Sequence, residues 1–196
     1  MDGTTEVNDN FVGVILAGGL SSRMGQDKAL LAMAGESLLM RCQRILKQAG
    51  ATTIVISRND GAPSHLADHY PQCGPLGGIH AALRTHVEQP LLIIPVDLPL
   101  LAPVTLIKLV HAGLQAGSNA HYDGHNLPLF ICRPADLIKP LEETLNSADN
   151  LSVGRFFSRF PRLTLPPDNS SALTNANTPA QWQAILQAHK PGITCP

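Results

Sequence analysis

Apolar runs alternate with amphipathic segments along the first half of this chain. Three continuous apolar runs are typical of strands buried on both faces of a parallel sheet, and they span residues 11–17, 52–57 and 91–96. Apolar residues at helical spacing follow each run and predict helices over residues 37–50, 77–87 and 103–117. Ser37 is placed to cap the first helix, Gly50 to end it, and Pro103 to open the third. Repeated β-then-α units predict a three-layer α/β/α sandwich.

The second half of the chain has shorter segments of mixed character. Residues 119–134 are typical of two short strands around an Asp-Gly turn. A helix over residues 135–145 is expected to break or bend at Pro140. In the last helix, Thr178 is the expected N-cap and Gln181 completes a capping box. These elements add an antiparallel portion to a mostly parallel sheet.

The composition describes a globular protein of ordinary character. With 196 residues, we expect a disordered leader over 1–10, a single domain over 11–190 and a tail over 191–196. A net charge of −1 argues against a nucleic-acid partner. No apolar run is long enough to cross a membrane, and the N-terminus lacks the basic and apolar regions of a signal peptide, which predicts a cytoplasmic protein. The four cysteines fit no zinc or disulfide spacing and are expected to be free thiols.

The loop after the first apolar run concentrates groups that suit a phosphate. Gly18 and Gly19 let the backbone approach a ligand and present amide hydrogens to it. Arg23 supplies a forked cation and Lys28 a point charge, the two ways in which proteins hold phosphate. The loop is neither a P-loop nor a G-x-G-x-x-G loop, because its glycine spacing differs and an alanine follows Lys28. A solvated turn with incidental charges is the alternative.

Asp97 directly follows the third apolar run, at the expected carboxyl end of a strand. Facing a triphosphate, this carboxylate suits Mg²⁺, which proteins usually hold with one or two carboxylates plus phosphates and water. The alternative is a turn cap. A glycine-rich turn over 74–78 leads into a helix start, whose free N–H groups suit anionic or carbonyl-bearing ligands.

A second metal site would need His121, Asp123 and His125, which lie close together in the sequence. No fourth ligand is evident, so a hairpin turn of ordinary polar residues is favoured there.

Four motifs resemble those of the molybdenum cofactor guanylyltransferases, the MobA-type enzymes of the MobA-like NTP transferase family. The stretch LAGGLSSRMGQDKALL is similar to the signature L-A-G-G-x-S-x-R-M-G-x-D-K. GPLGGI, PVDLPLL and TNANTPAQW are similar to the G-P-L-x-G, D-x-P and N-x-N-T-P segments of the family. The resemblance spans essentially the whole chain and implies a Rossmann-like fold of the nucleotide-diphospho-sugar-transferase type, with a nucleotide-binding N-terminal half and an acceptor-binding C-terminal half.

The resemblance also implies an activity and partners. The activity would be Mg²⁺-dependent transfer of GMP from GTP to the terminal phosphate of Mo-molybdopterin, which forms Mo-molybdopterin guanine dinucleotide and releases pyrophosphate. Transient contacts with molybdenum-insertion proteins and apo-molybdoenzymes are implied, and a monomer is expected.

Carried over by position, the resemblance assigns roles to individual residues. Lys28 and Arg23 would neutralise the triphosphate, and Asp97 would hold Mg²⁺. Asn175 and Asn177 would lie near the pterin phosphate or the metal. After the second strand, either Asn59 or Asp60 would reach the base or ribose, as would Asp68. The implied nucleotide contacts are Leu16, Ala17, Gly18, Gly19, Lys28, Asn59, Asp68, Gly74, Pro75, Leu76, Gly78 and Asp97.

Three alternatives stay open. Cytidylyltransferases acting on the same pterin typically have L-A-A-G where this chain has L-A-G-G, so Gly18 favours guanine, because a methyl there would crowd a purine pressed on the backbone. A phosphosugar nucleotidyltransferase is a more remote enzyme class with a different loop. A non-catalytic nucleotide or cofactor carrier would keep the binding site without the chemistry.

Leu127-Pro128 stands where many relatives have an H-P pair, which puts a histidine role there in doubt.

Overall fold

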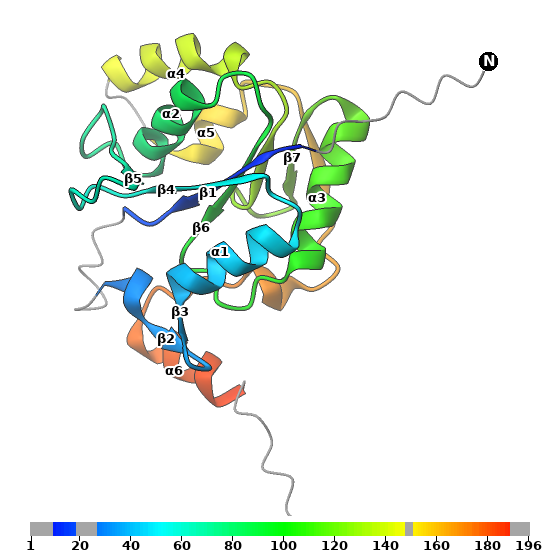
Figure 1. Ribbon diagram of the computed structural model, residues 1–196. Helices are drawn as coiled ribbons and strands as arrows, with labels where there is room; N and C mark the ends of the chain where they lie inside the picture. Colours follow the sequence, from blue (N-terminus) through cyan, green and yellow to red (C-terminus); the bar gives the residue numbers. More distant parts are fainter. Residues whose placement is uncertain (1–9, 19–26, 148–150, 189–196) are drawn as a thin grey trace, which may run out of the picture.

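The three apolar runs form neighbouring strands of one sheet in the computed structural model, which describes residues 10–18, 27–147 and 151–188 (Figure 1). The strands are β1 (Val12–Leu16), β2 (Ala32–Met33), β3 (Glu36–Ser37), β4 (Thr53–Ser57), β5 (His65–Leu66), β6 (Leu91–Pro95), β7 (Asn119–Tyr122), β8 (Leu129–Ile131) and β9 (Arg162–Leu165). The helices are α1 (Leu38–Gln48), α2 (Pro75–Thr85), α3 (Pro103–Ala116), α4 (Ala135–Ser147), α5 (Val153–Phe157) and α6 (Pro179–Ala188), with 3₁₀ helices η1 (Lys28–Leu30) and η2 (Ser170–Leu173).

The main sheet has the strand order β5-β4-β1-β6-β8-β7-β9. β1 pairs in parallel with β4 on one side and with β6 on the other, and β4 pairs in parallel with β5. β8 is antiparallel to both of its neighbours, β6 and β7, whereas β9 is parallel to β7. The expected mostly parallel sheet with an antiparallel portion is therefore confirmed.

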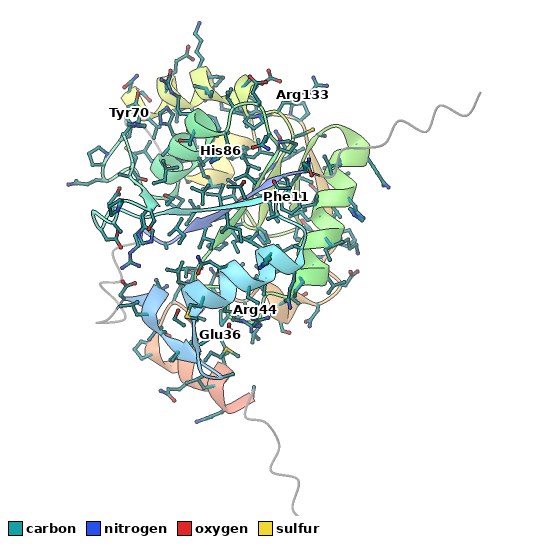
Figure 2. The ribbon with its side chains drawn as sticks, in the orientation of Figure 1. Phe11, Glu36, Arg44, Tyr70, His86 and Arg133 are labelled. Atoms are coloured by element: carbon teal, nitrogen blue, oxygen red, sulfur yellow. The ribbon has the colours of Figure 1, made fainter. Side chains whose placement is uncertain are left out.

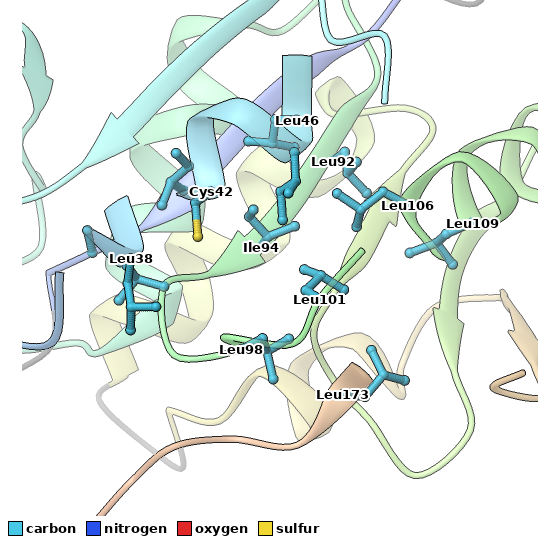
Figure 3. Close-up of a cluster of buried hydrophobic side chains, with 14 of the residues drawn as sticks. Leu38, Cys42, Leu46, Leu92, Ile94, Leu98, Leu101, Leu106, Leu109 and Leu173 are labelled. Carbon is cyan, nitrogen blue, oxygen red and sulfur yellow. The ribbon is translucent and has the colours of Figure 1, made fainter. Parts of the chain in front are cut away.

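Alternating side chains of the sheet supply two apolar clusters, one on each face. Val12 and Val14 of β1 belong to the cluster under α2, α4 and α5, whereas Ile15 belongs to the cluster under α1, α3 and α6. Figure 3 shows part of the second cluster, where Leu38 and Leu46 of α1 lie near the strand carrying Leu92 and Ile94. Both faces are covered, as the three-layer prediction requires, and this explains why the central strands have almost no polar residues.

The expected helix caps are present. The Ser37 hydroxyl accepts a hydrogen bond from the Met40 N–H at the start of α1. At α6, the Thr178 hydroxyl accepts from the Gln181 N–H, and the Gln181 side chain accepts in return from the Thr178 N–H. This reciprocal pair is the predicted capping box.

Of the break or bend predicted at Pro140, the break is wrong. α4 continues through Pro140 instead of breaking there. The ring removes only one backbone donor, and the helix keeps its buried face because Leu137, Leu141 and Leu145 all pack into the core. α2 also begins at Pro75, two positions before the expected start.

Several polar and sulfur-bearing residues have structural roles. His121 is buried, donates from Nδ1 to the His125 carbonyl oxygen at 2.9 Å, and bonds through Nε2 to the Thr164 hydroxyl at 3.0 Å. These contacts support the hairpin interpretation over a metal site. Cys42, Cys73 and Cys132 are free thiols as expected, whereas Cys195 lies outside the described residues. None of the helices in the described part of the chain is long and apolar enough to cross a membrane.

Candidate active site

The carboxyl ends of β4, β1 and β6 meet at one edge of the sheet. Leu16 at the end of β1 is paired with Ser57 of β4 and with Pro95 of β6. The chain continues from these ends into Ala17-Gly18, Arg58-Asn59 and Val96-Asp97. The connection from β1 leads to β4 on one side, while β6 lies on the other, so this edge is the topological switch point of the sheet. Ligands of open α/β sheets bind at such a point.

A polar cluster of Lys28, Asp97, Asn175 and Asn177 forms beyond the end of β6. The Lys28 ammonium donates to Asn177 Oδ1 at 2.6 Å and lies 3.3 Å from Asp97 Oδ2. Asn175 Nδ2 donates to the other carboxylate oxygen of Asp97 at 2.9 Å. The Ala176 N–H also donates to the Asp97 carbonyl oxygen at 2.9 Å, so the segment between η2 and α6 is held against the end of β6 by both backbone and side chains.

This cluster has the donors and acceptors that a metal-bound triphosphate needs. Asp97 Oδ2 and Asn177 Oδ1 converge on one positive charge, and they are oxygen ligands of the kind that Mg²⁺ prefers. Within the described residues, no group of three or more His, Cys, Asp or Glu side chains could hold a metal ion. The donor set therefore fits a Mg²⁺ ion held mainly by substrate phosphates and water, and it does not fit an all-protein cage.

A second polar group lies between β4 and the start of α2. Asn59 Nδ2 donates to Asp68 Oδ2 at 3.0 Å, and the Asp68 N–H donates to Asn59 Oδ1 at 2.7 Å. The Ser57 hydroxyl donates to Asp68 Oδ1 at 3.4 Å. A methyl group on Gly77 of α2 would lie 3.0 Å from Asp68 Oδ2, so this carboxylate lies beside the first turn of the helix. The structure thus brings Asn59 and Asp68 together at the β4 side of the switch point.

The remaining expected nucleotide contacts differ in exposure. Gly18, Gly74 and Pro75 are exposed, whereas Ala17 and Leu76 are buried and can offer a ligand their backbone rather than their side chains. Gly78 is also buried, and a methyl group there would lie only 2.2 Å from Ser57 Oγ. This glycine lets α2 pack closely on β4, and whether it also touches a nucleotide stays a prediction. Gly19 and Arg23 lie outside the described residues.

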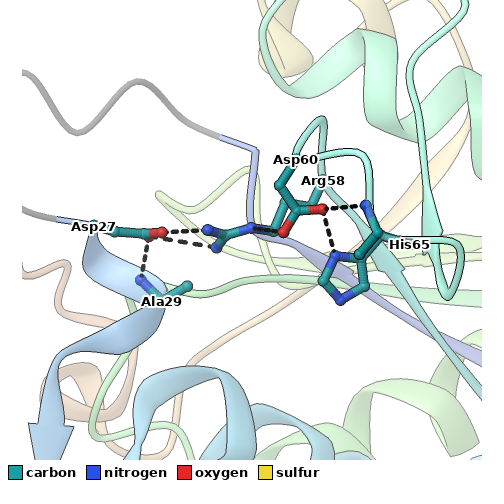
Figure 4. A network of polar contacts seen from close by, with 6 residues as sticks. Asp27, Ala29, Arg58, Asp60 and His65 are labelled. Carbon is teal, nitrogen blue, oxygen red and sulfur yellow. Dashed lines mark hydrogen bonds and ion pairs between the residues drawn. The ribbon is translucent and has the colours of Figure 1, made fainter.

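Sequence reasoning missed a chain of ion pairs on the β4 side of the site, shown in Figure 4. Arg58 pairs with Asp27 through its terminal nitrogens and with Asp60 through Nε at 2.7 Å. His65 Nδ1 lies 2.8 Å from Asp60 Oδ1. The hydrogen bond from Arg58 lowers the pKa of the Asp27 carboxyl, and the bond with His65 is the main cause that lowers the pKa of Asp60 to about 2. The only sequence signal was the position of Asp27 directly before Lys28, within the loop motif.

A family model described as a MobA-like NTP transferase domain matches residues 13–160, which include the ends of all three strands at this edge. The chain belongs to the MobA-like NTP transferase family. A relative named molybdenum cofactor guanylyltransferase, from Xanthomonas euvesicatoria pv. vesicatoria, is 36% identical over 180 residues, covering 90% of this chain and 94% of that protein. The resemblance seen in the four motifs is therefore confirmed, and this MobA-like NTP transferase is a nucleotidyltransferase.

Solved structures share the fold of this MobA-like NTP transferase at low sequence identity. Molybdopterin-guanine dinucleotide biosynthesis protein A from Archaeoglobus fulgidus has a TM-score of 0.73 and 19% identity, with 91% of this chain and 98% of that chain covered. The 2-C-methyl-D-erythritol 4-phosphate cytidylyltransferase of Thermus thermophilus has a TM-score of 0.69 at 14% identity, with the same coverage. A manganese complex of Rv0371c from Mycobacterium tuberculosis has a TM-score of 0.63 at 18% identity, again covering 91% and 98%. Their names include both a guanine and a cytidylyl protein, so the fold alone does not select the base.

Proposed function

We propose that this chain is a molybdenum cofactor guanylyltransferase, which transfers GMP from GTP to the terminal phosphate of Mo-molybdopterin and releases pyrophosphate. The observation that carries the proposal is the convergence of Lys28, Asp97 and Asn177 at the switch point of the sheet. The 36% identical relative carries that activity in its name and is covered over 94% of its length. GTP and Mo-molybdopterin are the proposed substrates.

The proposed reaction needs positioning and charge neutralisation more than covalent chemistry. An oxygen of the acceptor phosphate attacks the α-phosphorus of GTP, and pyrophosphate leaves from the opposite side. The acceptor phosphate is already ionised near neutral pH, so no general base is required. Lys28 neutralises the charge that develops on the triphosphate, with Arg23 proposed as the second cation.

Asp97 and Asn177 would hold a divalent cation, which we propose to be Mg²⁺. When bound, this ion would neutralise charge on the phosphates. Lys28 contacts both of these oxygens, at 3.3 and 2.6 Å. Asn175 holds the far side of the Asp97 carboxylate, which fixes the orientation of the oxygen that faces Lys28.

The choice of guanine rests on Gly18. A methyl group at this position would lie 3.7 Å from the Ser57 carbonyl oxygen and 3.8 Å from Cα of Arg58, which are ordinary contacts. The described part of the protein therefore leaves room for alanine at position 18. The need for glycine would come from the ligand, as expected if a purine packs against this backbone.

We further propose that the protein acts as a monomeric single domain over residues 11–190 in the cytoplasm. Transient contacts with molybdenum-insertion proteins and apo-molybdoenzymes would deliver and collect the cofactor. The partner contacts follow from the family resemblance, whereas the single domain and the location follow from the length and the hydropathy pattern of the sequence.

The test measures pyrophosphate release and pterin-dinucleotide formation with GTP, CTP or ATP, with Mo-molybdopterin and Mg²⁺ present. We expect turnover with GTP and formation of the guanine dinucleotide. Preference for CTP would identify a cytidylyltransferase instead. GTP binding without pyrophosphate release in the presence of acceptor would identify a carrier.

A Gly18→Ala variant sharpens the test of base choice. Because the methyl group has room in the protein, we expect an unchanged melting temperature. Specificity for GTP, measured as kcat/KM, should fall about tenfold or more, the usual effect of one misplaced methyl group in a tight site. Unchanged kcat/KM for GTP would remove Gly18 as the base determinant.

A further inference from the structure

Arg58 is the central residue of the ion-pair chain in Figure 4, and it touches the segment that carries Lys28. Its guanidinium donates to both oxygens of Asp27 and, through Nε, to Asp60 Oδ2 at 2.7 Å. Only 17% of the Arg58 side chain is exposed, and its charge-assisted bonds to Asp27 are partly buried, whereas the bond to Asp60 is exposed. Arg58 thus links the end of β4 to Asp27, the residue directly before Lys28.

Asp27 connects Arg58 to the backbone that carries Lys28. Its Oδ1 accepts a hydrogen bond from the Ala29 N–H at 3.0 Å and caps η1, which begins at Lys28. Ala29 itself is completely buried. The backbone of Lys28 is therefore held between a capping carboxylate that Arg58 orients and a neighbouring residue fixed in the core.

Arg58 also lies near Gly18, which follows β1. A methyl group on Gly18 would lie 3.8 Å from Cα of Arg58, and the Ala17 N–H donates to the Ser57 carbonyl oxygen at 3.0 Å. The residues before and after the loop, Gly18 and Asp27, therefore both have Arg58 as a neighbour. The backbone of Arg58 lies near Gly18, while its side chain pairs with Asp27, the residue directly before Lys28.

The charge of Arg58 is already neutralised by two carboxylates. A phosphate would have to compete with Asp27 and Asp60 for this guanidinium, whereas Lys28 faces Asp97 and Asn177 at the proposed metal site. The geometry therefore favours a role in holding the Lys28 segment over direct phosphate binding.

We propose that Arg58 is a positioning residue that, through Asp27, holds the Lys28 ammonium at the triphosphate site. The inference rests on the proposed function for its catalytic consequence. A misplacement of a catalytic group by about 1 Å can cost about a hundredfold in rate. The effect should appear in kcat more than in KM, because Lys28 acts mainly on the charge that develops during the reaction, whereas the other nucleotide contacts remain in place.

The kinetic test compares Arg58→Met with Arg44→Met. Arg44 of α1 forms an ion pair with Glu36 of β3, and Figure 2 shows the two side chains next to each other. We expect kcat per folded molecule to fall about ten- to a hundredfold in Arg58→Met, with little change in KM for GTP. Arg44→Met should keep both values, and Arg58→Lys should recover part of kcat because it can still pair with Asp27.

Asp27→Asn tests the route of the effect. Asparagine can still accept the Ala29 N–H and cap η1 but loses the ion pair with Arg58. We expect it to have no further effect on kcat in the Arg58→Met background, because both changes break one interaction. Additive losses in the double variant would overturn the proposed route.

Limited proteolysis gives a readout that does not depend on turnover. Trypsin cleavage after Lys28, followed by mass spectrometry, should be about tenfold faster in Arg58→Met, since charged hydrogen bonds limit local opening. It should be unchanged in Arg44→Met. An unchanged cleavage rate or an unchanged kcat in Arg58→Met overturns the positioning role. If the wild-type protein forms no guanine dinucleotide, the proposed function fails, and the cleavage rate still decides whether Arg58 holds this segment.

Discussion

The Asp97 carboxylate is held by residues from both ends of the chain. Lys28 lies on one oxygen and Asn175 on the other, although these residues are separated from Asp97 by 69 and 78 positions. Asp97→Asn keeps the size of the side chain and removes its charge. We expect kcat to fall about a hundredfold or more, because charge stabilisation at the reacting phosphates is the main catalytic contribution. Mg²⁺-dependent pyrophosphate release with GTP and acceptor measures the loss.

The matched control is Asp168→Asn. Asp168 also pairs with a lysine, Lys108, at 2.6 Å, but its side chain is 73% exposed. This variant should retain wild-type turnover. Wild-type turnover in Asp97→Asn would contradict a metal-holding role for Asp97.

Asp27 and Asp60 make the stability of the β4 side of the site dependent on pH. Arg58 lowers the pKa of Asp27 below its ordinary value of 3.8, and His65, followed by weaker donors, lowers that of Asp60 to about 2. The folded protein then binds fewer protons than the unfolded chain. The stabilisation is full above pH 3.8 and is lost as the pH falls toward 2.

Urea unfolding of wild type and Arg58→Met between about pH 5 and pH 2 measures this dependence. The stability difference between the two proteins should be largest near pH 5. It should shrink as Asp27 becomes protonated, because the neutral carboxyl no longer pairs with Arg58. A difference that stays constant over this range would contradict the ion pair.

The sequence shows which chemical groups a residue offers more readily than it shows which residue it contacts in the fold. Asp97 was predicted from its position directly after an apolar run and Lys28 from its place in the glycine-rich loop, and the family resemblance added Asn175 and Asn177. The pairing of Arg58 with Asp27 was not predicted, because it joins residues 31 positions apart and depends on the neighbouring strands. Charged residues after a strand show no periodicity from which such a partner can be inferred.

At the scale of elements, the packing of α2 against β4 determines the shape of the nucleotide side. A methyl group on Gly78 would lie 2.2 Å from Ser57 Oγ and 3.0 Å from a methyl carbon of Leu16. Gly78→Ala should therefore push α2 away from the sheet and lower the free energy of unfolding by about 1–3 kcal/mol. Chemical unfolding measures this change.

Ser57→Ala provides the matched rescue. Removing the hydroxyl relieves the shortest contact, so Gly78→Ala/Ser57→Ala should recover part of the lost stability. A double variant no more stable than expected from the sum of the single changes would show that the contact with Ser57 is not the cause.

The long elements follow from periodicity, and the short ones do not. β1, β4 and β6 were predicted because short uninterrupted apolar runs that end at turn residues are typical of strands covered on both faces. β2, β3 and β5 have two residues each, too few to show an alternating pattern. The wrong break at Pro140 has a different cause, since tertiary packing of the leucine face of α4 outweighs the local cost of proline.

At the scale of the whole molecule, the two ends of the described chain share one core. Trp182 and Ile185 of α6 pack into the same apolar cluster as Ile15 of β1 and Ile94 of β6. The segment before α6 also supplies Asn175 and Asn177 to the cluster around Asp97. Loss of the chain from Asn175 through α6 would therefore remove both core surface and site residues, which favours a single cooperative unit over a separable C-terminal part.

Trp182 is the only tryptophan in the sequence, so its fluorescence reports directly on α6. If residues 11–190 form one domain, unfolding followed by this fluorescence and by far-UV circular dichroism should give coincident transitions. GTP with Mg²⁺ should shift both midpoints together, because a ligand that binds only the folded state stabilises the entire cooperative unit. Asp97→Asn should reduce this shift. A fluorescence transition that precedes the loss of circular dichroism would show that α6 unfolds on its own, and the single-domain prediction would then be wrong.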